Sequence, residues 1–210
     1  MEIALNRKGH VFTMKVIGIT GGVGSGKSAL LSFVKENYNC RVILADEVAH
    51  KVEEPGEACY DALVALLSPD ILNEDGRINK NKMAAKIFQS GELLEKVNHI
   101  IHPAVRHLIL EEIAGERARG KRDFLFLEAA LLIEKGYIEI VDEMWYIYAD
   151  EQVRRRRLKE ARGYSDEKIS AIFRSQLKEE EYRRHCNLVI NNSQSLKRAC
   201  REIEERIRAL

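Results

Sequence analysis

Residues 21–28 read Gly-Gly-Val-Gly-Ser-Gly-Lys-Ser, which is the phosphate-binding pattern G-x-x-x-x-G-K-S. Glycine allows tight backbone turns, so that several N–H groups can surround a phosphate chain. The ammonium group of Lys27 can reach the β- and γ-phosphates of a nucleotide, and the hydroxyl of Ser28 can ligate Mg²⁺. This stretch, which we call the phosphate loop, predicts a binding site for a nucleoside triphosphate.

The segments on both sides of the phosphate loop have the order that such a site needs. Residues 15–20 form a short apolar run with β-branched side chains, which predicts a buried strand. Residues 29–34 have the pattern of the first turns of a helix, whose N-terminus would face the bound anion. A strand, a loop and a helix in this order favour a phosphate site over a chance glycine-rich turn.

The bulk properties narrow the class of protein. A length of 210 residues suits one domain with a sizeable core. The 34 basic and 33 acidic residues give a net charge of +1, which offers no general case for nucleic-acid or membrane binding. No apolar run is long enough to span a bilayer, and residues 1–13 lack the apolar core of a signal peptide. The four cysteines form no C-x-x-C pair, which indicates free thiols in a reducing cytoplasm.

Apolar, strand-like runs alternate with helical patterns along the chain. Further strands are predicted at residues 41–44, 124–127, 144–148 and 188–190. Helices are predicted at residues 48–67 with a break at Pro55, and at 83–88, 93–101, 105–118, 151–160, 166–182 and 195–210. Pro103 is expected to end one of these helices. The alternation predicts an α/β fold, with a five-stranded parallel sheet and helices on both faces.

Asp46 follows the predicted strand at residues 41–44. Ligands of open α/β sheets lie beyond the carboxyl ends of the strands, so a carboxylate there can accept a hydroxyl proton during in-line phosphoryl transfer. The alternative interpretation is that Asp46 only caps the following helix. A regulatory GTPase is disfavoured, because neither Asn79-Lys80 nor Asn81-Lys82 is completed to the N-K-x-D sequence that recognises guanine.

Residues 154–157 are four consecutive arginines, and Arg162 follows them. The simplest interpretation is a solvated helix face, as charge runs usually are. Successive helical residues point about 100° apart, so the four arginines cannot all face one site. We therefore expect only one or two of them to reach a ligand.

Six segments occur in the order found in dephospho-CoA kinases, namely residues 18–28, 45–50, 54–56, 102–103, 130–134 and 157–163. The chain resembles this family from residue 14 to about residue 207. The family transfers a phosphoryl group from ATP to the ribose 3′-hydroxyl of dephospho-CoA, in the last step of coenzyme A synthesis. The resemblance implies a three-layer P-loop kinase fold over residues 14–210. It also implies a helical CoA-binding part at about 55–120, a lid at about 154–183 and a flexible extension at 1–13.

The resemblance also implies a two-part site. The residues expected to act in catalysis are Asp46, Lys27 and Arg157. Those expected to bind ATP are Gly22, Val23, Gly24, Ser25, Gly26, Lys27, Ser28, Ala29, Arg157, Arg162 and Asn192. Those expected to bind the acceptor substrate are Asp46, His102, Arg106 and Glu134. Ser28 is the expected metal ligand, and Mg²⁺ is the expected cofactor.

Departures from the family pattern leave alternatives open. Leu44 stands where the family often has aspartate, and Ala130 and Ile133 replace proline and phenylalanine. Glu128 is a candidate to hold Mg²⁺ through water, or else a helix cap. The expected partners are ATP and dephospho-CoA, with no nucleic acid or membrane, for a monomer or small homo-oligomer. The alternatives are a P-loop kinase for another small hydroxyl or a nucleoside monophosphate, and a nucleotide-binding regulatory protein without catalysis.

Overall fold

The computed structural model describes residues 14–88, 90–129, 132–133 and 136–210. The predicted extension at residues 1–13 and the candidate substrate ligand Glu134 lie outside the described residues. The described chain divides into two compact units. The first unit comprises the chain up to Val42 together with Glu116–Leu210, and the second comprises Ile43–Gly115.

A five-stranded sheet runs through the chain in the order β2-β3-β1-β4-β5. Its strands are β1 (Lys15–Thr20), β2 (Cys40–Leu44), β3 (Phe124–Glu128), β4 (Glu143–Tyr148) and β5 (Leu188–Asn191). The pairings of β1 with β3, of β1 with β4 and of β4 with β5 are parallel. The predicted five-stranded parallel sheet is therefore confirmed, and β1, which leads into the phosphate loop, is its central strand.

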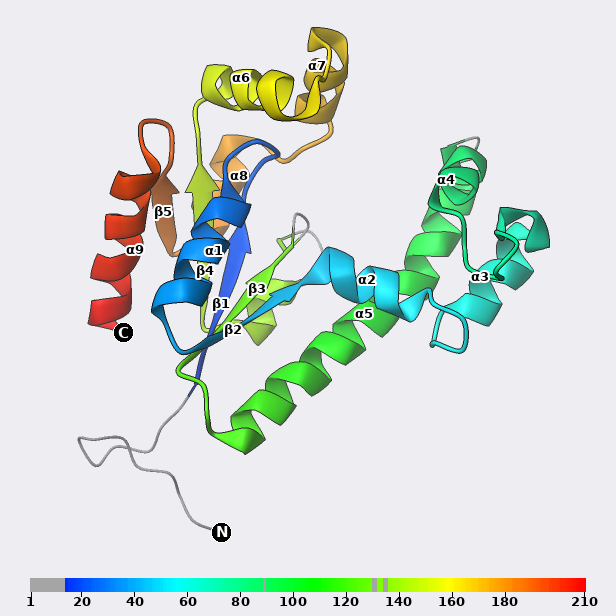
Figure 1. Cartoon of the computed structure of the whole chain (residues 1–210), viewed down its shortest axis with the longest axis horizontal. Coiled ribbons are helices and arrows are strands. Elements are labelled where there is room, and N and C mark those ends of the chain that lie inside the picture. Colours follow the sequence, from blue (N-terminus) through cyan, green and yellow to red (C-terminus); the bar gives the residue numbers. More distant parts are fainter. Residues whose placement is uncertain (1–13, 89, 130–131, 134–135) are drawn as a thin grey trace. The chain divides into compact units, whose positions relative to one another are not determined.

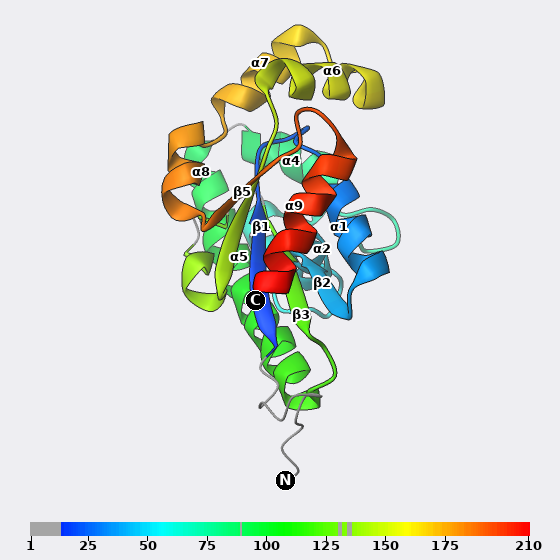
Figure 2. The ribbon, with the colours of Figure 1, turned by 90° about the vertical axis from the view of Figure 1, so that its left-hand side faces the viewer.

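Helices cover both faces of the sheet in the first unit (Figure 2). On one face lie α1 (Lys27–Asn37) and α9 (Leu196–Ala209), which bury Leu30, Val34 and Ile203. On the other face lies α8 (Glu179–His185), whose Tyr182 stacks on Tyr146 of β4 with ring centroids 4.6 Å apart. Two further helices, α6 (Glu151–Arg162) and α7 (Asp166–Arg174), lie beyond the carboxyl ends of β1 and β4 (Figure 1).

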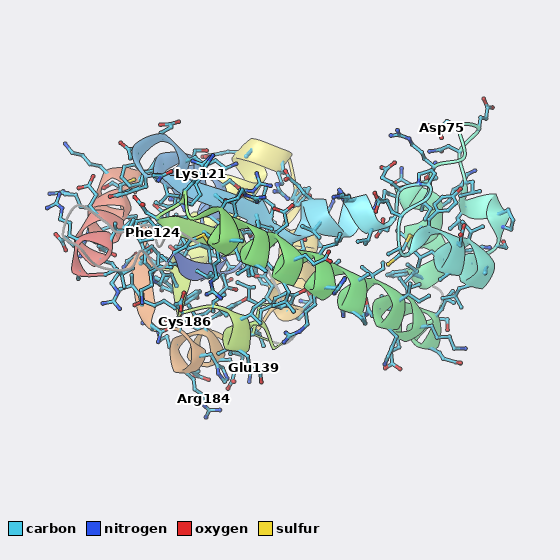
Figure 3. All side chains as sticks on the ribbon, turned by 90° about the horizontal axis from the view of Figure 1, so that it is seen from below. Asp75, Lys121, Phe124, Glu139, Arg184 and Cys186 are labelled. Carbon is cyan, nitrogen blue, oxygen red and sulfur yellow. The ribbon has the colours of Figure 1, made fainter. Side chains whose placement is uncertain are left out.

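The second unit is helical. It contains α2 (Ala45–Val52), α3 (Tyr60–Leu67), the short 3₁₀ helix η1 (Pro69–Ile71), α4 (Lys80–Phe88) and most of α5 (Gly91–Arg119). The predicted break near Pro55 is confirmed, because α2 ends at Val52 and α3 begins at Tyr60. Between η1 and α4 the chain forms an exposed loop from which Asp75 projects (Figure 3). No described helix is long and apolar enough to cross a membrane.

The prediction that Pro103 separates two helices is wrong, because α5 continues through it. Proline lacks the N–H that would bond the carbonyl four residues earlier, and this costs helix stability. The buried positions Val97, Val105, Ile109 and Ile113 nevertheless fall at helical spacing on both sides of the proline. Burial of this continuous apolar face outweighs the missing hydrogen bond.

The prediction of one helix over residues 166–182 is also wrong, because the segment forms α7 and α8 with a break between them. At the end of α7 the hydroxyl of Ser175 donates to the carbonyl of Ile172 at 2.9 Å, which gives the chain an alternative to further helix bonds. Lys178 then adopts an extended conformation, with φ −69° and ψ 152°, before α8 begins. Acidic residues open α8 and basic residues end it, as the helix dipole favours.

Candidate active site

The phosphate loop joins β1 to α1 through a tight turn. The N–H of Ser25 donates to the carbonyl of Gly22 at 3.1 Å and closes this turn. Gly26 is the N-cap of α1 and has φ 92° and ψ 23°, in the left-handed region that glycine adopts without strain. A side chain at this position would also overlap the amide of Asn192. The predicted strand, loop and helix order is therefore confirmed.

Lys27 lies in the first turn of α1 and points back along the loop. Its ammonium donates to the carbonyl of Gly21 at 2.7 Å, and its Nζ lies 3.6 Å from Oε1 of Glu128. The two charged side chains are 13% and 16% exposed, so their mutual attraction is weakly screened. Glu128 ends β3 opposite Ile19 of β1, which is why residues about a hundred positions apart meet here. Both Lys27 and Glu128 are candidate site residues from the sequence, but the sequence does not predict their ion pair.

Arg157 and Asn192 hold the outer side of the loop by its carbonyl groups. The Arg157 guanidinium donates to the carbonyls of Gly24 at 3.3 Å, of Ser25 at 3.2 Å and of Asn192 at 2.8 Å. The side-chain amide of Asn192 donates to the same Ser25 carbonyl at 2.8 Å. Burial and the neighbouring Arg156 lower the pKa of Arg157, yet an arginine stays protonated in proteins. The site therefore contains a permanent cation directed at backbone oxygen atoms.

These carbonyl contacts orient the N–H groups of the loop. In a trans peptide the C=O and the N–H of the next residue point in opposite directions. A Ser25 carbonyl fixed on the side of Arg157 therefore directs the N–H of Gly26 to the other side. Oriented N–H groups of this kind form the concavity that receives phosphate oxygens.

Arg154 makes a further contact with the loop that the sequence did not distinguish from its neighbours. Its Nε donates to the carbonyl of Val23 at 2.9 Å, and its Nη2 donates to Oε1 of Gln176 at 2.5 Å. Its guanidinium also lies 4.2 Å from the centre of the Phe173 ring. A row of arginines carries no signal that selects one of them, because the selection depends on where α6 meets the loop.

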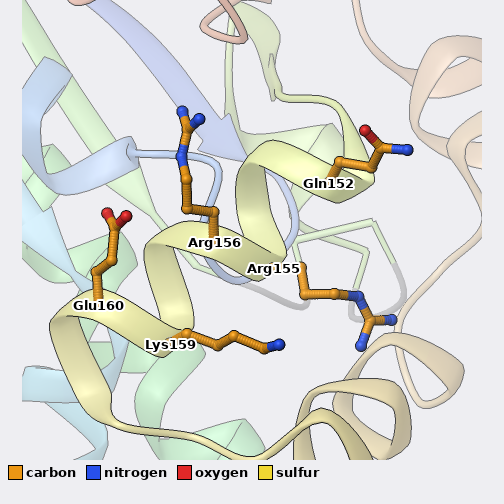
Figure 4. Close-up of a pocket in the computed structure, with 5 residues that line it drawn as sticks. All are labelled: Gln152, Arg155, Arg156, Lys159 and Glu160. Atoms are coloured by element: carbon orange, nitrogen blue, oxygen red, sulfur yellow. The ribbon is translucent and has the colours of Figure 1, made fainter.

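The other arginines of the run face elsewhere. Arg155 and Arg156 line an outer groove of α6, together with Gln152, Lys159 and Glu160 (Figure 4). Arg155 forms an ion pair with Asp166 at 3.0 Å. Arg162 is exposed at the end of α6, with its guanidinium 5.9 Å from the centre of the Tyr164 ring. The prediction that the four consecutive arginines cannot share one site is confirmed, and the structure does not bring Arg162 to the loop.

Three of the four candidate acceptor residues, Asp46, His102 and Arg106, lie in the second unit. Asp46 is exposed in the first turn of α2, and the N-cap position of that helix is Leu44. The interpretation of Asp46 as the cap of this helix is therefore wrong, and its carboxylate stays available for chemistry. His102 and Arg106 are half-buried, one helical turn apart in α5.

Buried polar atoms gather at the loop. Among the described residues, Thr20 Oγ1, Ser25 Oγ and Asn192 Oδ1 have no hydrogen-bond partner. Their residues are 0%, 1% and 2% exposed. An unsatisfied buried group costs about 1–3 kcal/mol, so such a cluster is typical of a site built for a polar ligand rather than of a packed core.

The residues around the loop fit a magnesium ion that arrives with a nucleotide. Ser28 presents an exposed hydroxyl on α1, beside Lys27. Within the described part of the chain, no three His, Cys, Asp or Glu residues form a group that could hold a metal by themselves. Mg²⁺ usually takes few protein ligands and completes its shell with water and substrate phosphates, so this donor set suits it.

Comparison with known proteins gives the same family as the resemblance found in the sequence. A sequence model of the dephospho-CoA kinase family matches residues 15–198. A dephospho-CoA kinase of Geobacillus kaustophilus is 37% identical over 177 residues, which cover 84% of this chain and 87% of the relative. A dephospho-CoA kinase of Dehalococcoides mccartyi is 33% identical over 180 residues, which cover 86% of this chain and 89% of that relative.

Solved structures have the same fold. A crystal structure of a Thermus thermophilus protein matches with a TM-score of 0.78 and 30% identity, and the match covers 94% of this chain and 98% of that one. A dephospho-CoA kinase from Campylobacter jejuni matches with a TM-score of 0.69 and 21% identity, over 93% of this chain and 96% of that one. At that identity the likeness shows the fold alone. The three-layer P-loop kinase fold is confirmed, and the chain belongs to the dephospho-CoA kinase family.

Proposed function

We propose that this protein transfers the γ-phosphoryl group of ATP to the ribose 3′-hydroxyl of dephospho-CoA, which completes coenzyme A. The observation that carries the proposal is the extent of the family match. It runs from Lys15 of β1 to Arg198 of α9, and so includes the phosphate loop, the helical second unit and the α6–α7 segment. A chain that shared only nucleotide binding with the family would match at the phosphate loop alone.

The donor half of the proposed site is the phosphate loop. The residues that bind the ATP phosphates are those from Gly22 to Ala29, with the backbone N–H groups and the ammonium of Lys27 as donors. The contacts of Arg157 and Asn192 with the loop support this role, because they fix the N–H groups before a nucleotide arrives. Ser28 would hold Mg²⁺ together with phosphate oxygens. When bound, the ion neutralises negative charge on the phosphates.

The residues proposed to serve the acceptor substrate include Asp46, which acts as general base. The 3′-hydroxyl oxygen forms a bond to the γ-phosphorus, the bond from that phosphorus to the β–γ bridging oxygen breaks, and ADP leaves. The hydroxyl proton passes to the Asp46 carboxylate. His102, Arg106 and Glu134 bind the acceptor, with the Arg106 guanidinium suited to a diphosphate.

The lid and the cell compartment belong to the same proposal. We assign α6 and α7 to a lid that excludes water, which would otherwise compete for the phosphoryl group. Arg162 would reach the phosphates only when this lid closes. Residues 55–120 would bind the CoA portion of the acceptor, and the enzyme would work in the cytoplasm.

The test is an assay of the purified full-length chain with ATP, Mg²⁺ and dephospho-CoA. We expect coenzyme A and ADP in equal amounts, separated by liquid chromatography and identified by mass. A matched reaction with 3′-deoxy dephospho-CoA, which lacks the accepting hydroxyl, should give no phosphorylated product. Nucleotide binding without turnover of any acceptor would instead support a regulatory protein.

A further inference from the structure

Arg154 connects two segments that are far apart in the sequence. On one side its Nε donates to the carbonyl of Val23 in the phosphate loop at 2.9 Å. On the other side its Nη2 donates to Gln176, directly after α7, at 2.5 Å, and its guanidinium lies 4.2 Å from the centre of the Phe173 ring. One side chain of α6 therefore contacts both the phosphate loop and the α7 segment.

Gly22 provides the space for this contact. A Cβ at position 22 would lie 2.8 Å from Nη1 of Arg154, and closer still to Nη2 and Cζ. The backbone of Gly22 is not in the left-handed region, so its conformation alone does not require glycine. A side chain at this position would therefore displace the guanidinium of Arg154.

The surroundings of Arg154 make the two contacts depend on each other. Burial lowers the pKa of its guanidinium, while Tyr146 and Tyr182 raise it. The guanidinium of Arg154 is partly buried, so unsatisfied donors there would cost stability. Loss of the Gln176 contact would therefore favour rehydration of the side chain, and with it loss of the Val23 contact.

The Val23 contact bears directly on the phosphate loop. Because the peptide is trans, a Val23 carbonyl held by Arg154 directs the N–H of Gly24 to the opposite side. Free rotation of this peptide would remove one oriented donor from the loop. The geometry thus links the position of α7 to the readiness of the loop for phosphate.

We propose that Arg154 is a positioning residue that sets the phosphate loop for a nucleotide only while the α7 segment is docked against it. The proposal rests on the proposed function only for nucleotide binding, and it does not depend on the acceptor. By linkage, a nucleotide that prefers the oriented loop must also stabilise the docked α7.

The first test is a double-mutant cycle on the dissociation constant of ADP, measured by titration calorimetry. Arg154→Ala removes the guanidinium that donates to the Val23 carbonyl, and the added methyl group of Gly22→Ala displaces that guanidinium. Each should weaken ADP binding by about 10-fold, the value of one hydrogen bond to a charged group. The double variant should also be only about 10-fold weaker, because the second change has nothing left to remove. Additive losses, about 100-fold in the double variant, would overturn the proposal.

Gln176→Leu tests the same link without a change in the loop or in Arg154. It should weaken ADP binding by about 3- to 10-fold, since the rehydrated Arg154 would release Val23. An unchanged ADP affinity would contradict the proposal. Because this variant keeps Arg154 and leaves its contact with Val23 chemically possible, the test stands even where Arg154→Ala fails to fold.

Hydrogen exchange separates positioning from a purely local role. In Arg154→Ala, amide exchange should rise both in peptides that cover residues 21–28 and in peptides that cover residues 166–176. Arg174→Ala is the matched control, since it removes an exposed cation of α7 that forms no hydrogen bond or ion pair with another described residue. It should change neither set of peptides. A rise confined to one set would overturn the proposal, and failure of the dephospho-CoA assay would leave these results unaffected.

Discussion

Arg157 and Asn192 are joined by a hydrogen bond of 2.8 Å from the guanidinium to the backbone carbonyl, and both donate to the carbonyl of Ser25. Arg157, which the sequence predicts to bind ATP, thus contacts the protein backbone. This arrangement gives Arg157 a role that a simple charge cannot fill, because its planar fork spans three carbonyl groups.

Arg157→Lys keeps the positive charge and loses the fork. We expect kcat/KM to fall by about 10²-fold, close to the fall in Arg157→Ala, because one ammonium cannot bridge the same three oxygens. Steady-state kinetics with varied ATP measure this. Recovery of most of the activity by lysine would show instead that Arg157 acts as a point charge on the phosphates.

Asn192→Asp replaces the amide donor with a carboxylate beside the Ser25 carbonyl. The lost hydrogen bond and the buried charge should destabilise the protein by about 2–3 kcal/mol, a fall in Tm of about 5–10 °C. Asn191→Asp is the matched control, because the side-chain oxygen of Asn191 accepts the N–H of Ser193 and a carboxylate can still do so. Calorimetry that finds equal losses in both variants would contradict the assigned contact.

Ser68 has φ 66° and ψ 156°, a backbone conformation that is essentially restricted to glycine. Lys86 stabilises this turn by donating to the Ser68 hydroxyl at 2.7 Å and to the Leu67 carbonyl. Ser68→Gly and Ser68→Ala both remove the hydroxyl, but only alanine keeps the Cβ in the strained position. The glycine variant should be more stable than the alanine variant by about 1–2 kcal/mol in urea unfolding. Equal stabilities would show that no strain is stored at this position.

The contacts of Glu143 should make part of the stability of the fold depend on pH. Its carboxylate accepts hydrogen bonds from Trp145 at 2.7 Å and from Arg206 of α9. Burial alone would raise the pKa of Glu143, but the hydrogen bonds from Arg206 and Trp145 outweigh it, so that the pKa lies below its ordinary value of 4.5. The stability from this pair is complete above the unfolded pKa, and it is lost as the pH falls through the lower folded pKa.

Glu143→Gln should therefore be less stable than the unmodified protein at neutral pH, by about 1–3 kcal/mol. The difference should shrink as the pH falls below about 4.5. Urea unfolding at several pH values measures the difference. Glu205→Gln, which changes an exposed carboxylate of α9, the helix that carries Arg206, serves as control. A pH-independent gap between the Glu143 variant and the unmodified protein would contradict the assignment.

Asp46 and Glu47 form a natural pair for testing the general base, since both are exposed acids in the first turn of α2. Asp46→Asn should lower turnover by about 10²–10⁴-fold if its carboxylate accepts the hydroxyl proton. Glu47→Gln removes a neighbouring charge and should change turnover by less than about threefold. Equal effects of the two changes would mean that only the charge of this turn matters.

Much of the fold follows from local patterns in the sequence. The phosphate loop requires a strand before it and a helix after it, and short apolar runs mark strands that are buried on both faces. The errors arose where packing outweighed local preference. The apolar face of α5 carries the helix through Pro103, and the stacking of Tyr182 on Tyr146 belongs to a separate helix, α8, rather than to an extension of α7.

The site was predictable in its residue types but not in its contacts. Gly22, Lys27 and Asn192 stand in recognisable positions of the sequence. The different roles of the four consecutive arginines could not be predicted, because Arg154 and Arg157 differ from their neighbours only in the direction in which their side chains point from α6. Such directions depend on long-range packing, which a single sequence does not state.

The most direct measurement is a comparison of acceptors at equal concentration. The kcat/KM for ATP-dependent phosphorylation would be determined with dephospho-CoA, with nucleoside monophosphates and with small hydroxyl compounds, at saturating ATP and Mg²⁺. We expect dephospho-CoA to exceed every other acceptor by at least about 10²-fold, since binding of its remote groups is used in the transition state. Comparable or faster turnover of another acceptor, or no coenzyme A at all, would contradict the proposed function.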